Sequence, residues 1–147
     1  MIFKQNNPYE PNVFYHVYNR GNRKSEIFYE QEDYSRFLST MKRFLKDYSV
    51  ILYSYCLMPN HYHLLINSGS SPWEISPFMH RFMTSYSIYF NKKYSFVGRV
   101  FQDSYKAKAI YTLDSFCKVR EYIAKNPIEA NLVRNINDYK WYKEARL

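Results

Sequence analysis

Two apolar segments with a short break between them, residues 50–57 and 61–66, constrain the fold of this chain more than any other feature. The first segment is apolar on both faces towards its start, which is typical of a strand buried within a sheet. Pro59 and Asn60 interrupt the chain, and such a short break joins neighbouring strands. The sequence therefore predicts a β-hairpin within an antiparallel sheet.

Apolar residues at helical spacing predict the helices that pack on this sheet. The clearest helix covers residues 31–47, and its apolar stripe should face a core. The stripe consists of Tyr34, Phe37, Leu38, Met41, Phe44, Leu45 and Tyr48. Ser76 and Pro77 have the residue types of an N-cap and a first helical position, so we expect a second helix from there to about Asn91.

The remaining segments complete an alternation of strands and helices. Residues 12–18 favour a first strand, and residues 94–112 begin as a loop and become extended. A third helix should run from Phe116 to about Asn126, with Pro127 as its stop. The order β-α-β-β-α-β-α predicts an α+β, ferredoxin-like sandwich: an antiparallel sheet of about four strands with helices packed on one face. Another α+β sandwich would also fit this order.

Length and charge narrow the class of protein. The 147 residues fit a single domain, 1–147, with residues 1–11 as a loose lead-in. The net charge of +8 favours nucleic acid over an anionic membrane as partner. No apolar run is long enough to cross a bilayer, no signal-peptide core opens the chain, and the two cysteines match no zinc or redox spacing. We therefore expect a reduced, cytoplasmic protein.

The second of the two apolar segments carries a His-x-His motif. Residues i and i+2 of a strand point to the same face, so His61 and His63 should project together, with Tyr62 on the opposite face. Two imidazoles on one face can hold one divalent metal through their ring nitrogens. The alternative is a sheet that carries two exposed or hydrogen-bonded histidines.

The third predicted helix offers a second set of polar groups. Tyr122 and Asn126 are four residues apart and share a helix face, which puts a phenol beside a neutral oxygen ligand. A tyrosine oxygen can attack DNA phosphorus, forming a phosphotyrosine and freeing a DNA hydroxyl, so that the phosphodiester is exchanged and not hydrolysed. The alternative is a surface tyrosine with an asparagine near the helix end, where asparagine is common.

Several motifs resemble the single-tyrosine HUH transposases, and in particular the REP-associated tyrosine transposases and their IS200-like relatives. The likeness runs from about residue 12 to 141. It rests on the segments YHVYNRG (15–21), MPNHYHLLI (58–66), YFNKKY (89–94), GRVFQ (98–102), YIAKNP (122–127) and DYKW (138–141). The serines that usually follow the C-terminal tryptophan in this family are absent here.

This resemblance implies a metal-dependent enzyme that cuts and rejoins single-stranded DNA at hairpin-forming sequences. It makes His61 and His63 the metal pair, Tyr122 the nucleophile and Asn126 the third ligand. The insertion-sequence branch usually has glutamine in place of Asn126. Oxygen ligands and phosphate favour Mg²⁺ or Mn²⁺, although two histidines leave zinc open. A homodimer fits the insertion-sequence branch, and a monomer fits the REP-associated branch equally well.

Six cations are candidate phosphate contacts by charge and location, and the alternative for each is a solvated surface side chain. They are Arg20, Arg23, Lys24, Arg99, Lys106 and Lys108. Tyr105 is a weaker candidate nucleophile, because it lies in a predicted strand and lacks the amide four residues on.

Two other functions remain open from the sequence. A non-catalytic binder of DNA or RNA hairpins would bind without metal and form no covalent adduct. A metal phosphodiesterase that uses water would still cleave after Tyr122→Phe.

Overall fold

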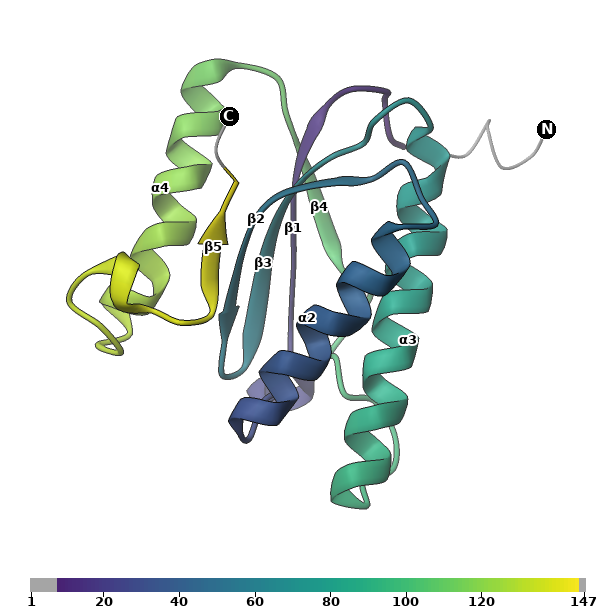
Figure 1. Ribbon diagram of the computed structural model, residues 1–147, viewed down its shortest axis with the longest axis vertical. Coiled ribbons are helices and arrows are strands. Elements are labelled where there is room, and N and C mark those ends of the chain that lie inside the picture. The colour runs from purple at the N-terminus through teal and green to yellow at the C-terminus, as the bar shows by residue number, and fades with distance from the viewer. Residues whose placement is uncertain (1–7, 146–147) are drawn as a thin grey trace.

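The β-hairpin predicted for residues 50–66 lies in the middle of a five-stranded antiparallel sheet (Figure 1). The computed structural model describes residues 8–145. Across the sheet the strands follow the order β4-β1-β3-β2-β5. In chain order they are β1 (Phe14–Arg20), β2 (Ile51–Met58), β3 (His61–Asn67), β4 (Lys106–Ile110) and β5 (Tyr142–Glu144). The first four strands were predicted, and β5 adds a short fifth strand beside β2.

Helices cover both faces of the sheet. They are α2 (Gln31–Leu45), α3 (Ile75–Tyr94) and α4 (Leu113–Glu129). Helices α2 and α3 pack together on one face, and α4 lies on the opposite face (Figure 1). Three short 3-10 turns join the elements: η1 (Asn22–Lys24), η2 (Pro72–Glu74) and η3 (Ile136–Asp138). The predicted α+β sandwich is confirmed, with two helices on one face and the third on the other.

Helix α3 begins at Ile75, so the prediction that Ser76 caps it was wrong. The turn η2 already carries the chain into helical geometry, and Glu74 takes the capping position. Pro77 therefore lies inside the first turn, where its missing N–H would have had no helical partner.

Helix α4 continues through Pro127, so the prediction that this proline stops the helix was wrong. The loss of one backbone donor falls in the last turn, which makes it far less disruptive than in a helix centre. The carbonyl of Pro127 still accepts a hydrogen bond of 3.0 Å from Leu132 N. At the other end, Thr112 caps the helix, as its residue type predicted, because its Oγ1 accepts a bond of 3.1 Å from Ser115 N.

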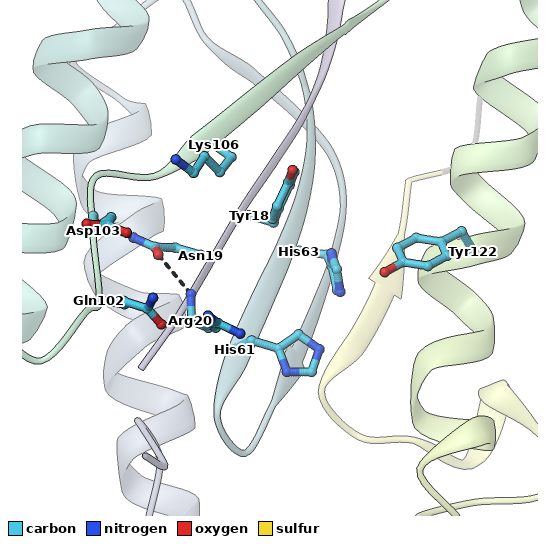
Figure 2. A pocket seen from close by; sticks show the side chains of 9 residues that line it. All are labelled: Tyr18, Asn19, Arg20, His61, His63, Gln102, Asp103, Lys106 and Tyr122. Atoms are coloured by element: carbon cyan, nitrogen blue, oxygen red, sulfur yellow. Dashed lines mark hydrogen bonds between the residues drawn. The ribbon is translucent and has the colours of Figure 1, made fainter. Parts of the chain in front are cut away.

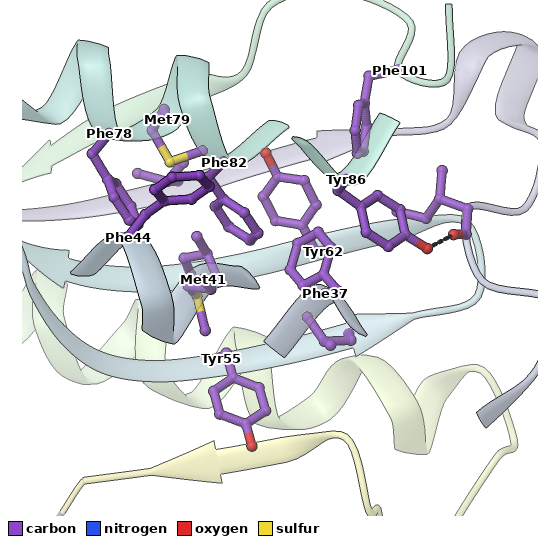
Figure 3. Close-up of a cluster of buried hydrophobic side chains, with 14 of the residues drawn as sticks. Phe37, Met41, Phe44, Tyr55, Tyr62, Phe78, Met79, Phe82, Tyr86 and Phe101 are labelled. Atoms are coloured by element: carbon purple, nitrogen blue, oxygen red, sulfur yellow. Dashed lines mark hydrogen bonds between the residues drawn. The ribbon is translucent and has the colours of Figure 1, made fainter. Parts of the chain in front are cut away.

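The larger core lies between the sheet and helices α2 and α3, and it is rich in aromatic rings (Figure 3). The ring of Phe37 has its centroid 5.3 Å from that of Tyr62 and 5.1 Å from that of Tyr86, and all three are fully buried. A smaller core on the opposite face includes Ile123 of α4 and Leu65 of β3. The alternation of side chains along β3 thus divides its residues between the two helical layers.

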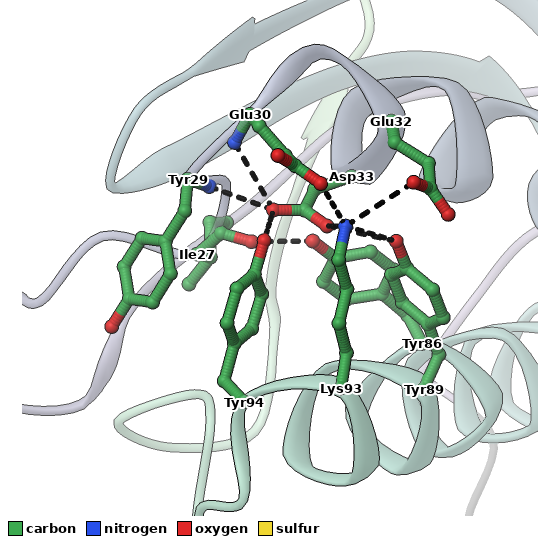
Figure 4. A network of polar contacts seen from close by, with 9 residues as sticks. All are labelled: Ile27, Tyr29, Glu30, Glu32, Asp33, Tyr86, Tyr89, Lys93 and Tyr94. Carbon is green, nitrogen blue, oxygen red and sulfur yellow. Dashed lines mark hydrogen bonds and ion pairs between the residues drawn. The ribbon is translucent and has the colours of Figure 1, made fainter.

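A buried carboxylate, Asp33, joins α2 to α3 (Figure 4). It accepts hydrogen bonds from the Tyr94 hydroxyl at 2.5 Å, the Tyr89 hydroxyl at 2.8 Å and the Lys93 ammonium at 2.9 Å. Burial alone would raise the pKa of Asp33, but the bonds from Tyr94 and Lys93 outweigh it and hold the pKa below its usual value. Lys93 also pairs with Glu30. The two helices on this face are therefore joined by polar contacts as well as by apolar packing.

Aromatic contacts fix both ends of the described chain. Of the predicted lead-in, residues 1–7 lie outside the described residues, and Tyr9 packs edge-on against Tyr15 with ring centroids 5.1 Å apart. Near the other end, Trp141 stacks on Tyr34 of α2 with centroids 4.6 Å apart. The C-terminal segment thus runs from α4 past the β2 edge to the helices of the opposite face (Figure 1).

Candidate functional site

The two histidines of the His-x-His motif lie on the face of β3 that α4 covers, as strand alternation predicted. Tyr62, between them, points into the aromatic core on the other face. The imidazole centroids of His61 and His63 are 5.1 Å apart and their planes are nearly perpendicular, at 88°. His63 is buried opposite Tyr18 of β1, whereas His61 is half-buried at the start of the strand.

Helix α4 brings Tyr122 and Asn126 to these histidines. The ring centroid of Tyr122 lies 5.6 Å from that of His63, and Asn126 Oδ1 lies 3.3 Å from His61 Nε2. Asn126 Nδ2 donates a bond of 3.0 Å to the Tyr122 carbonyl, which turns the amide oxygen towards His61. The tyrosine ring is 54% exposed, so its hydroxyl is open to a ligand. All four residues predicted for the chemistry therefore meet in one place.

His61 faces two amide oxygens but, as a neutral imidazole, carries one proton. Its Nδ1 donates to Asn60 Oδ1 at 2.7 Å. Its Nε2 then presents a lone pair to the lone pairs of Asn126 Oδ1, 3.3 Å away. Burial lowers the pKa of His61, against the hydrogen bond with Asn126 that raises it, so a second proton is disfavoured. Two lone pairs that face each other in this way fit a cation between them.

A third histidine, His16 of β1, was given no role by the sequence analysis. Its Nε2 lies 2.9 Å from His63 Nδ1, and the two rings are stacked with centroids 5.1 Å apart. Burial and the charge of Lys108 lower the pKa of His16 to about 4, and burial with the charges of His16 and His61 lowers that of His63 to about 3. Both rings are therefore neutral at pH 7. When His63 Nδ1 donates to His16, His63 Nε2 keeps its lone pair.

The donor set fits a divalent cation. His63 Nε2 is buried and has no hydrogen-bond partner among residues 8–145. It joins His61 Nε2 and Asn126 Oδ1 as an unused lone pair. In the same described part of the chain, no three His, Cys, Asp or Glu side chains group as a metal site, so an amide must supply the third ligand. Two imidazole nitrogens and one amide oxygen leave coordination positions for a phosphate oxygen.

These groups open into a cavity of about 360 Å³, here called the tyrosine pocket (Figure 2). Its lining is Tyr18, Asn19, Arg20, His61, His63, Gln102, Asp103, Lys106 and Tyr122. Figure 2 shows the Tyr122 hydroxyl directed from α4 towards His63, with Lys106 on the β4 side. A second cavity of about 350 Å³ shares Tyr18, His63 and Tyr122 and extends to Lys108 and Lys118. The phenol thus lies between two cavities that both contain cations.

The six predicted phosphate contacts are distributed along a series of cavities. Arg20 and Lys106 line the tyrosine pocket, and Lys108 lines the second cavity beside it. Arg20 also lines a cavity of about 330 Å³ with Arg23 and Lys24, here called the turn cavity. Arg99 lies apart from these three cavities, in a fourth.

Tyr105, the weaker candidate nucleophile, lies elsewhere. It directly precedes β4, and its hydroxyl is 2.8 Å from the hydroxyl of Tyr9. Its ring packs against the aromatic core under α2 and α3, so it does not line the tyrosine pocket.

Comparisons with known proteins point to one family. The model of the family described as IS200-like transposase matches residues 10–126. No curated protein matches the sequence. Among residues 8–145, no helix has the length and apolar character required to cross a membrane.

Solved structures share the fold at low sequence identity. A REP-associated tyrosine transposase bound to a REP hairpin has a TM-score of 0.74 and 16% identity, over 91% of this chain and 78% of that chain. A presumed transposase from Deinococcus radiodurans has a TM-score of 0.56 and 14% identity, over 79% of this chain and 92% of that one. The tRNA(His) guanylyltransferase of Saccharomyces cerevisiae reaches 0.57 at 10% identity, over 88% and 64%. The same sandwich therefore occurs in proteins with different chemistry.

Proposed function

Because the chain belongs to the family of IS200-like transposases, we propose that it cleaves and rejoins single-stranded DNA at hairpin-forming sequences through a covalent phosphotyrosine at Tyr122. The observation that carries this proposal is the position of the Tyr122 phenol in one pocket with His61 and His63, which expose unused lone pairs. A nucleophile and a cation-binding set in one cavity are the parts that phosphoryl transfer needs.

The bonds balance in two steps. The Tyr122 oxygen attacks a DNA phosphorus, its proton passes to solvent, and the bond from phosphorus to one deoxyribose oxygen breaks. That oxygen takes up a proton and leaves as a free DNA hydroxyl. A DNA hydroxyl then attacks the phosphotyrosine, releases Tyr122 and joins the strands. One phosphodiester replaces another, so rejoining requires no ATP.

Mg²⁺ or Mn²⁺ would be held by His61 Nε2, His63 Nε2 and Asn126 Oδ1. When bound, such an ion supplies positive charge that neutralises and orients the phosphate. The residues of the chain do the rest: Asn126 turns its oxygen inward through its bond to the Tyr122 carbonyl, and His16 holds the ring of His63.

The partner that we propose is single-stranded DNA folded into a hairpin, because a protein of the same fold has been solved with a REP hairpin. Arg20 and Lys106 are the cations best placed to contact the phosphates beside the scissile one, since they line the tyrosine pocket. Lys108 lies on the other side of the Tyr122 ring, where it would contact the strand as it leaves.

One copy of the chain is sufficient to assemble this site. Tyr122 and Asn126 reach His61 and His63 of the same chain, with no residue borrowed from a second copy. We therefore propose that cleavage does not depend on the homodimer that the insertion-sequence branch suggests.

The direct test uses end-labelled single-stranded hairpin DNA from beside the gene of this protein. The protein is incubated with this DNA and Mg²⁺ or Mn²⁺, and products are separated on a denaturing gel. We expect a metal-dependent covalent adduct with the wild type and none with Tyr122→Phe, because phenylalanine keeps the ring and removes the nucleophilic oxygen. Tyr111→Phe, at a tyrosine that is 70% exposed outside the pocket, is the matched control and should form the adduct.

Two results would overturn the proposal. Cleavage without an adduct, unchanged in Tyr122→Phe, would indicate a phosphodiesterase that uses water. Binding of several hairpins with neither cleavage nor adduct would indicate a non-catalytic binding module.

A further inference from the structure

A fourth cavity, of about 510 Å³, lies between η1 and the loop that follows α3, away from the histidines. Its walls are largely aromatic, with Tyr29, Phe90 and Phe96, and the cations Arg23 and Arg99 also line it. We propose that this aromatic cavity binds an unpaired nucleobase of the DNA strand whose phosphate lies at Tyr122. The inference rests on the proposed function and adds a site at which the strand is held.

The aromatic rings are arranged as a supported platform. Phe96 is 48% exposed and Tyr29 is 45% exposed, and their ring centroids are 6.2 Å apart. Beneath them Tyr94 lies 4.6 Å from Tyr29, and Phe90 lies 6.0 Å from Phe96. Exposed aromatic faces held by other rings can accept a flat base by stacking, whatever its sequence.

The charges around the platform favour a nucleotide over an apolar partner. Arg23 and Arg99 are both in the lining, and Glu26 is the single carboxylate there. Guanidinium groups contact phosphate and also stack on bases. An apolar segment of a protein would cover the rings but would leave these two cations without a matching charge.

The backbone of η1 is shaped to present its cations. Arg23 and Lys24 both have left-handed φ values, 57° and 60°, which are uncommon for residues other than glycine. The turn closes tightly on Gly21, where an added Cβ would clash with the Ser25 carbonyl oxygen. Strained backbone of this kind persists where the surrounding structure imposes it, and it concentrates at functional sites.

A continuous path joins the aromatic cavity to Tyr122. The tyrosine pocket and the turn cavity share Arg20 and Gln102, and the turn cavity and the aromatic cavity share Asn22 and Arg23. The cations met along this path are Lys106, Arg20, Lys24, Arg23 and Arg99. A groove with positive charge along it and aromatic rings at intervals is how proteins hold single strands.

The test measures binding separately from cleavage. In EDTA, fluorescence anisotropy compares hairpins that have an unpaired tail with the same hairpin without the tail. We expect Phe96→Ala to weaken binding of the tailed hairpin by about tenfold or more, and to reduce its advantage over the tailless one. Phe96→Trp, which keeps an aromatic face, should retain tight binding. Tyr111→Ala is the matched control, because Tyr111 is exposed and lines none of the four cavities.

Cross-linking identifies the base. With 5-iododeoxyuridine placed at successive tail positions and irradiated, we expect one position to cross-link to the peptide that contains Phe96. Equal binding of both hairpins by wild type and Phe96→Ala, with cross-links elsewhere, would overturn the inference, and adduct formation at Tyr122 would then still support the proposed function. A tail-dependent loss in Phe96→Ala without any adduct in metal would support the cavity as a base site while overturning cleavage.

Discussion

At the scale of single residues, His16 determines how His63 presents its free nitrogen. The contact of 2.9 Å between His16 Nε2 and His63 Nδ1 fixes the orientation of a buried ring whose Nε2 has no hydrogen-bond partner among the described residues. Partners of this kind orient the ligands of a metal and set the tautomer that binds it. His16 is therefore a positioning residue: it would act on the metal through His63.

We expect His16→Phe to lower the affinity for Mn²⁺ by about ten- to a hundredfold, because phenylalanine fills the space but cannot accept a proton from His63. His16→Gln, which offers an amide oxygen, should lose less. The measurement is Mn²⁺ binding followed by electron paramagnetic resonance, without DNA. His80→Phe changes an exposed histidine of α3 and should have no effect. Equal affinities in His16→Phe and wild type would leave His16 with a packing role only.

Strand alternation and helical spacing identify His61, His63, Tyr122 and Asn126 as residues that could meet, and they do meet. His16 was not identified in this way. Its role depends on β1 pairing with β3 and on which rings then stack, and neither is encoded in local sequence spacing. The regular alternation of β1, which puts His16 and Tyr18 on one face, was the signal available.

At the scale of the elements, the Asp33 carboxylate is the main polar connection between α2 and α3. Its side chain is buried and is held by hydroxyl and ammonium donors from α3. Its depressed pKa means that the folded state binds the proton less readily than the unfolded chain does. The contribution to stability is therefore present above the ordinary pKa of aspartate and is lost as the pH falls through the lower pKa of the folded state.

We expect Asp33→Asn to lower the free energy of unfolding at pH 7 by about 3 kcal/mol, because Lys93 and the tyrosines lose their charged acceptor. The difference from wild type should shrink on acidification below the aspartate range. Urea unfolding at pH 7 and in acid measures both effects. Asp47→Asn, at an exposed carboxylate 3.9 Å from Arg81, should cost less than about 1 kcal/mol. A constant difference between Asp33→Asn and wild type at all pH values would contradict this account.

Strong periodicity over a full helix predicted α2 well, whereas single residues misplaced helix ends. Ser76 and Pro77 fit a cap locally, but the turn η2 had already started the helical geometry. Pro127 fits a stop, but in the last turn its missing donor matters little. Strand β5 has three residues and no period of its own, so only its pairing with β2 defines it.

At the scale of the whole molecule, the net charge of +8 becomes functional where cations line a connected path. Each cation that contacts a phosphate releases a counterion on binding, so affinity falls as salt rises. Cations elsewhere on the surface contribute far less to this dependence.

We expect Lys106→Gln to reduce the slope of log affinity against log salt by about 0.7 for a single-stranded hairpin tail, because one phosphate contact is lost. Lys42→Gln, at an exposed lysine of α2 outside the cavities described, should leave the slope unchanged. Anisotropy titrations at several salt concentrations give both slopes. An equal fall in the two variants would show that Lys106 acts only through net charge.

The fold class followed from the order of elements, but the aromatic cavity did not. Tyr29, Phe96 and Arg99 come from segments far apart in the sequence, and they face one cavity only after α3 has packed beside η1 and the loop that follows it. Sequence spacing describes neighbours within an element, and a cavity of this kind is formed between elements.

The lysines of β4 also have a consequence for self-association. A strand at the edge of a sheet leaves backbone donors and acceptors unpaired, and another copy can add to it. Strand β4 is such an edge, and Lys106 and Lys108 place two charges along its five residues. Like charges on two such edges repel, which discourages growth of one sheet onto the next. Replacing both lysines with valine should therefore weaken DNA binding and also promote aggregation, so light scattering should accompany any binding measurement on that variant.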